Sequence, residues 1–123
     1  MEINSYRDLK VWQKAMDLAV ECHRVTAGFP REETYGLVAQ IRRAAGSVPA
    51  NLAEGHGREN TGSFVQFCRI AQGSLKELET HLILSERLGY VDGERGAALL
   101  ARADEIGRMV RSMIRRLQEK VQG

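Results

Sequence analysis

The chain has 123 residues, which is enough for one domain with a buried core. Apolar residues make up 43% of it and charged residues 28%, so the composition excludes a disordered chain, and no apolar run is long enough for a membrane-spanning helix. The 18 basic and 16 acidic residues leave a net charge of +2, so any argument for nucleic-acid binding depends on where the charges lie.

The first predicted helix covers about residues 5–27 and has an unusually wide apolar face. Two rows of residues repeat at spacings of three and four and lie side by side around the helix. Because one partner surface covers only one row well, we expect this helix to contact both the core and a second surface. Gly28 and Pro30 end it. One row is Leu9, Trp12, Met16, Ala19 and His23, and the other is Val11, Ala15, Leu18, Cys22 and Val25.

The second predicted helix begins near Arg31 and ends at Gly55 or Gly57. Its large apolar residues and its small residues lie on different sides, and the small side lets another backbone approach closely. Residues 44–53 carry no charge, so we expect protein to surround them. Pro49 removes one backbone hydrogen bond and should bend the helix. The large row is Leu37, Ile41, Ala45, Val48 and Leu52, and the small row is Ala39, Gly46, Ala50 and Ala53.

Two further helices are predicted, over about residues 62–88 and about residues 93–120. Ser63 is a suitable N-cap for the third helix, and Gly89 ends it. Both helices carry apolar rows at helical spacing. These rows are Phe64, Phe67, Ala71, Leu75, Leu78 and Leu82 in the third helix, and Leu100, Ala103, Gly107, Val110, Ile114, Leu117 and Val121 in the fourth.

Four long helices joined by short connections predict an all-α fold, an antiparallel up-down four-helix bundle, built from one domain over residues 1–123. Strand patterns, internal repeats and low-complexity segments are absent from the sequence. The first residues, MEINSYRDLK, carry charges before any apolar block, so we expect no secretory signal and a cytoplasmic protein without membrane contact.

The sequence predicts no catalytic, cofactor-binding or metal-binding residues. A di-iron bundle uses Glu-x-x-His pairs, and none of the three histidines has a Glu three positions before it. Glu77 and His81 offer only two metal ligands, so an ordinary side-chain pair is expected there. Cys22 and Cys68 form no metal or redox motif and are expected to be buried free thiols. The glycines of GHG at 55–57 lack the strand and the lysine of a phosphate-binding loop.

Basic residues dominate the end of the fourth helix. At 100° per residue, its arginines lie opposite Val110 and Ile114, an arrangement typical of contact with a phosphate backbone. The alternative is a solvated face whose arginines favour the helix. Aromatic residues are not interleaved with the arginines, so any binding should be backbone-driven and weakly sequence-specific. The candidates are Arg108, Arg111, Arg115 and Arg116, with Arg42 and Arg43 as weaker ones.

A polar row runs along the second helix between its large and small rows. It is either a solvent face or a buried polar network that fixes the register of subunits. Arg43 and Glu54 lie about 16 Å apart along a straight helix, so each is expected to find a partner on another helix or subunit. The row is Gln40, Arg43, Ser47, Asn51 and Glu54.

Several blocks of the sequence resemble one family, the four-helix proteins encoded in intervening sequences of 23S ribosomal RNA genes. The resemblance covers nearly the whole chain, although the fourth helix matches only in its general pattern. The blocks with the most specific match are QIRRA at 40–44, NLAEG at 51–55 and GSLKELE at 73–79. The wider stretches are YRDLKVWQKAMDL at 6–18, FPREETYGLVAQIRRAAGSVPANLAEG at 29–55, FCRIAQGSLKELETHL at 67–82 and LGYV at 88–91.

The resemblance implies a bundle that assembles into a closed ring, a homopentamer. Proteins related to this family serve as accessory factors of diversity-generating retroelements, where they bind nucleic acid and a reverse transcriptase. The family has no established biochemical activity, and the resemblance assigns no catalytic residue.

Together these observations predict a non-enzymatic, homo-oligomeric protein that binds RNA or DNA or serves as a ribonucleoprotein accessory factor. It needs no cofactor. The alternative is a protein-interaction module whose ring scaffolds another polypeptide, such as a reverse transcriptase.

Overall fold

A computed structural model describes residues 5–122, and the side chains of residues 5–120. This part of the chain contains helices and no strand. The long helices are α1 (Lys10–Thr26), α2 (Leu37–Gly57), α3 (Thr61–Arg87) and α4 (Gly93–Gln122). Two short 3₁₀ helices precede α1 and α2, namely η1 (Tyr6–Asp8) and η2 (Arg31–Glu33).

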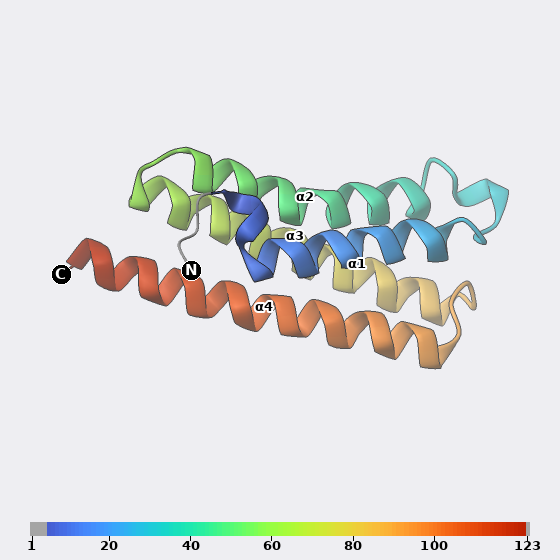
Figure 1. Ribbon diagram of the computed structural model, residues 1–123. Coiled ribbons are helices and arrows are strands. Elements are labelled where there is room, and N and C mark those ends of the chain that lie inside the picture. Colours follow the sequence, from blue (N-terminus) through green and yellow to red (C-terminus); the bar gives the residue numbers. More distant parts are fainter. Residues whose placement is uncertain (1–4, 123) are drawn as a thin grey trace.

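The four long helices lie side by side, and consecutive helices run in alternating directions in Figure 1. Each packs against the next one along the chain, and α1 also packs against α4, which closes the bundle. The α1–α2 face is therefore opposite the α3–α4 face. The predicted four-helix bundle is confirmed, and no described helix is long and apolar enough to cross a membrane.

One apolar row from each long helix forms the core. The row of α1 that contains Val11, Leu18 and Cys22 is buried, as is the large row of α2. Such burial stabilises the fold by about 1.5–3 kcal/mol for each large side chain. Half of the described apolar row predicted for α4 is buried, namely Ala103, Val110 and Ile114, and the other half is half-buried. The side chain of Val121 lies outside the described residues.

Two predicted helix starts are wrong, because local backbone bonding forms a short 3₁₀ helix first. The Ser5 side chain accepts from the Arg7 amide and the Asp8 carboxylate accepts from the Ser5 amide, so the first residues form η1, and α1 begins only at Lys10. Similarly, residues 31–33 form η2 instead of the first turn of α2. Glu33 still acts at that helix start, since its Oε1 accepts from the Leu37 amide at 3.2 Å.

The ends of α3 differ in how well they were predicted. Asn60, not Ser63, is the N-cap, and its Oδ1 accepts from the Ser63 amide at 2.9 Å. Gly89 ends the helix as predicted, with a φ of +80° that favours glycine. Pro49 lies inside α2 and is buried.

Candidate nucleic-acid interface and association groove

An apolar groove of about 830 Å³ separates the outer sides of α1 and α2. Trp12, Met16 and Val20 line it from α1, and the last two are 39% and 43% exposed. The Tyr6 and Trp12 rings pack edge-to-face with their centroids 5.2 Å apart, which extends the apolar wall toward η1. The two rows of α1 therefore have different environments: one is in the core, and the other borders this groove.

Small residues of α2 form the opposite wall of the groove. Gly46, Ala50 and Ala53 line it together with Pro49, and a Cβ added at Gly46 would meet no atom within 4 Å. The uncharged stretch 44–53 thus has one side in the core and another on open space. This geometry leaves room for part of another molecule, and the close approach of another backbone to the small row stays a prediction.

The predicted arginines of α4 are all exposed, on the side of the helix opposite the buried Val110 and Ile114. Arg108 forms an ion pair with Asp104, in which Arg108 Nη2 lies 3.1 Å from the carboxylate. The other three have no hydrogen-bond or ion-pair partner within the described part of the chain; they are Arg111, Arg115 and Arg116.

The arginines border two different grooves. Arg111 lines a groove of about 300 Å³ between α3 and α4, where the Lys76 ammonium is 3.1 Å from the Glu79 carboxylate. Arg108 and Arg116 line a second groove, of about 720 Å³, between α4 and the start of α1. The predicted row is therefore a cationic surface that covers both flanks of α4.

Arg42, a weaker candidate in the sequence, is half-buried and hydrogen-bonded to the end of α1. Its Nε donates to Thr26 Oγ1 at 3.0 Å, and its Nη2 donates to the His23 carbonyl at 3.2 Å. Thr26 is buried, and its hydroxyl donates to the Cys22 carbonyl at 2.7 Å. A cation at the carboxyl end of α1 also complements the helix dipole, so this contact joins α2 to the end of α1.

We expect Arg42→Met to lower the free energy of unfolding by about 1–2 kcal/mol, because it removes two charge-assisted hydrogen bonds from a half-buried site. Urea denaturation followed by circular dichroism measures this loss. Arg69→Met, at an exposed position of α3, is the control and should change stability by less than about 0.5 kcal/mol. Equal stability of the two variants would show that the contact at Thr26 contributes nothing.

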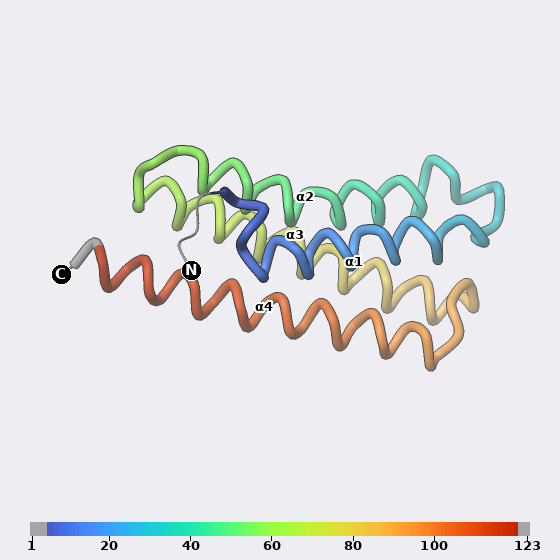
Figure 2. The backbone as a smooth tube through the Cα atoms, viewed as in Figure 1, coloured from blue at the N-terminus to red at the C-terminus, as the bar shows by residue number. Residues whose placement is uncertain are grey.

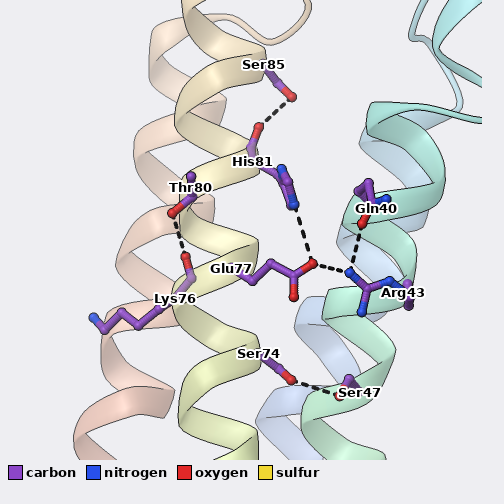
Figure 3. A network of polar contacts seen from close by, with 9 residues as sticks. All are labelled: Gln40, Arg43, Ser47, Ser74, Lys76, Glu77, Thr80, His81 and Ser85. Atoms are coloured by element: carbon purple, nitrogen blue, oxygen red, sulfur yellow. Dashed lines mark hydrogen bonds and ion pairs between the residues drawn. The ribbon is translucent and has the colours of Figure 1, made fainter.

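The polar row of α2 faces α3, and Figure 3 shows the resulting network. Arg43 forms an ion pair with Glu77 and donates to Gln40 Oε1 at 2.8 Å. The Ser47 and Ser74 hydroxyls share a hydrogen bond of 2.8 Å. Arg43 thus has its partner on another helix, as predicted.

The rest of the row stays within α2. Asn51 Nδ2 donates to the Ser47 carbonyl and hydroxyl at 2.8 and 2.9 Å. Glu54 pairs with Arg58, 3.2 Å away at the end of the same helix, so the prediction of a partner on another helix or subunit is wrong for Glu54. A role of this row in subunit register stays a prediction.

Sequence reasoning predicted the side-chain pair of Glu77 and His81 in the α3 half of this network, but it missed the links of Glu77 and Ser74 to α2. Ser74, Glu77 and His81 recur at spacings of three and four, which place them on one helix face. That spacing could have predicted a polar face on α3. His81 Nε2 lies 3.5 Å from Glu77 Oε2, and its buried Nδ1 has no hydrogen-bond partner among the described residues.

The two cysteines are buried free thiols, as predicted. Burial, with a smaller effect of the Glu21 carboxylate, raises the pKa of Cys22 to about 12. Burial raises the pKa of Cys68 to about 11. Both thiols therefore stay protonated at neutral pH, which makes them poor nucleophiles and poor metal ligands. The described residues contain no cluster of three or more His, Cys, Asp or Glu that could hold a metal ion.

Comparisons with known proteins agree with this architecture. A crystal structure of a protein with unknown function from the S23 ribosomal protein family, from Bacteroides thetaiotaomicron, is 23% identical and superimposes with a TM-score of 0.76. The match covers 85% of this chain and 97% of that one, and at this identity it shows the fold alone. A search of curated proteins gave no match. Residues 7–112 match the model of one protein family, and this chain belongs to that family, the 23S rRNA-intervening sequence proteins.

Proposed function

We propose that this protein is a non-enzymatic nucleic-acid-binding protein of the cytoplasm, which acts as a homopentamer and contacts phosphates through α4. The proposal depends on the exposed Arg111, Arg115 and Arg116, because their charges have no acidic partner in the described chain. Guanidinium groups of this kind match phosphate geometry and release counterions when they bind nucleic acid. The absence of a metal-holding cluster among the described residues is compatible with binding alone.

The α1–α2 groove supports the homopentamer in this proposal. The groove offers large side chains on one wall and small residues on the other, so the surface of one copy complements that of the next. Since α3 and α4 lie on the opposite side of the bundle, a ring built through this groove leaves Arg111 and Arg115 in solvent. Repetition around the ring turns three charges per subunit into a belt of positive potential.

Salt dependence is the direct test of this function. The purified native protein is titrated against a labelled RNA hairpin and a labelled DNA duplex at about 50 and 200 mM salt. Three phosphate contacts give a slope near −2.7, so affinity should fall about 40-fold between the two conditions, and further if several subunits bind. Absence of binding at the lower salt concentration, or binding that salt does not weaken, would reject the proposal.

The apolar groove also favours a second function, in which the protein scaffolds another polypeptide. Proteins related to the family that this sequence resembles serve diversity-generating retroelements, which makes a reverse transcriptase the partner to test. The two proteins are co-expressed and purified through a tag on one of them, with and without nuclease. A complex that survives nuclease and is lost in Ala50→Glu supports this function, and a complex lost with nuclease supports nucleic-acid binding instead.

A further inference from the structure

The cations of α4 lie on two flanks of the helix and not along one line. Arg111 lines the groove toward α3, whereas Arg116 lines the groove toward α1. Five positions of a regular helix separate these two residues by about 140° around the axis. Arg115 is exposed between them, and Lys120 is exposed nearer the end of the helix. A ligand that reaches all of these charges must contact both flanks of α4.

Along these arginines, α4 lies between α3 on one flank and the start of α1 on the other, with its outer side in solvent. The carboxyl-terminal end of α4 extends past the connection between α2 and α3 (Figure 1 and Figure 2). A helix with its side chains is about 10–12 Å across, close to the width of about 12 Å of the major groove of B-form DNA. The grooves of a duplex are bordered by two rows of phosphates, one from each strand. A single strand offers only one row.

Side chains for stacking unpaired bases are absent from this surface. None of the residues that line the two grooves beside α4 is aromatic. Proteins that hold single strands combine cations with aromatic side chains on which the bases stack. Tyr35, which is 94% exposed, belongs to the connection between η2 and α2 and not to these grooves.

Acidic residues in the two grooves already have partners. Glu105 lies 3.1 Å from the Lys14 ammonium, and Glu79 lies 3.1 Å from the Lys76 ammonium. Asp8 accepts from the Ser5 amide at 3.2 Å. The two ammonium groups offset the charges of Glu105 and Glu79, so phosphates can approach both flanks.

From these observations we infer that the ligand of α4 is a double-stranded nucleic acid, whose two phosphate rows contact the two flanks of the helix. The inference rests on the proposed function, since it names the class of nucleic acid that the same arginines bind. It makes paired strands the ligand, and Arg111 and Arg116 contact different strands of one duplex.

A comparison of paired and unpaired strands tests this inference. One labelled strand, designed not to pair with itself, is titrated with the native protein alone and after annealing, as DNA and as RNA. At least one duplex should bind with a Kd about tenfold or more below that of its single strand. Single strands that bind as tightly as both duplexes would overturn the inference and leave the proposed function standing. If no probe binds at low salt, both fall.

Single neutral substitutions then test the two flanks. Arg111→Gln and Arg116→Gln should each reduce the slope of log affinity against log salt for the duplex by about one, since each removes one phosphate contact. Arg95→Gln, near the other end of α4, is the matched control and should leave the slope unchanged. A slope that responds to only one of the two flanks would overturn the two-row arrangement.

Discussion

Ala50→Glu should convert the assembled protein into monomers whose helices remain folded. Ala50 is exposed on the α1–α2 groove, so in a separate bundle the new carboxylate stays in water and disturbs no internal contact. In an assembly that covers the groove, the same carboxylate is buried in a mostly apolar lining, where the guanidinium of Arg24 is already paired with Glu21 at 2.8 Å. Burial of such a charge costs about 4 kcal/mol or more, which corresponds to about a 1,000-fold weaker association.

Light scattering after size exclusion measures the mass of the parent and the variant, and circular dichroism measures their helical content. Ala101→Glu is the matched control, because Ala101 is exposed on α4 outside the groove. It should keep the mass of the parent. An Ala50→Glu variant that also keeps this mass would show that another face holds the copies together, and a monomeric parent would reject the assembly itself.

The helix faces could be predicted from the sequence because burial follows helical periodicity. The two rows of α1 separate as their spacing implies, with Leu18 in the core and Met16 on the groove. The residues at which the helices begin were harder to predict. The Ser5 side chain caps a 3₁₀ helix instead of α1, and the residues after Pro30 form a second 3₁₀ helix instead of the start of α2. These starts are set by a few local hydrogen bonds that apolar periodicity does not record.

In the candidate site, too, helical periodicity predicts some features and not others. Exposure of Arg111 and Arg115 follows from their angle on α4, which the sequence contains. Arg42 and Thr26 are sixteen positions apart in the sequence and lie on different helices. The angular position of Arg42 on α2 does not predict this contact. Likewise, the pairing of Arg43 with Glu77 depends on which helix packs beside α2. Contacts between residues of different helices can be predicted only when it is known how the helices pack, and the sequence pattern of one helix does not contain that information.

Reversal of three charges on α4 should abolish nucleic-acid binding. The variant replaces Arg111, Arg115 and Arg116 with Glu, at positions that are exposed and have no partner in the described chain, so the helical content and mass should stay as in the parent. Three attractive phosphate contacts become three repulsive ones in each subunit. The loss of three contacts alone accounts for about 100-fold or more at low salt, and the repulsion increases it. Anisotropy titration with the labelled duplex measures the change.

A matched variant separates this site from the effect of net charge. Arg31, Arg87 and Arg95 are also exposed, and they belong to η2, to the end of α3 and to the start of α4. Their replacement with Glu changes the net charge by the same amount, but at the end of the bundle away from the carboxyl-terminal end of α4 (Figure 1). Distant charges are screened beyond about 10 Å at 0.1 M salt, so this variant should retain most of the affinity of the parent. Equal losses in the two variants would mean that total charge governs binding, and that α4 has no special position in it.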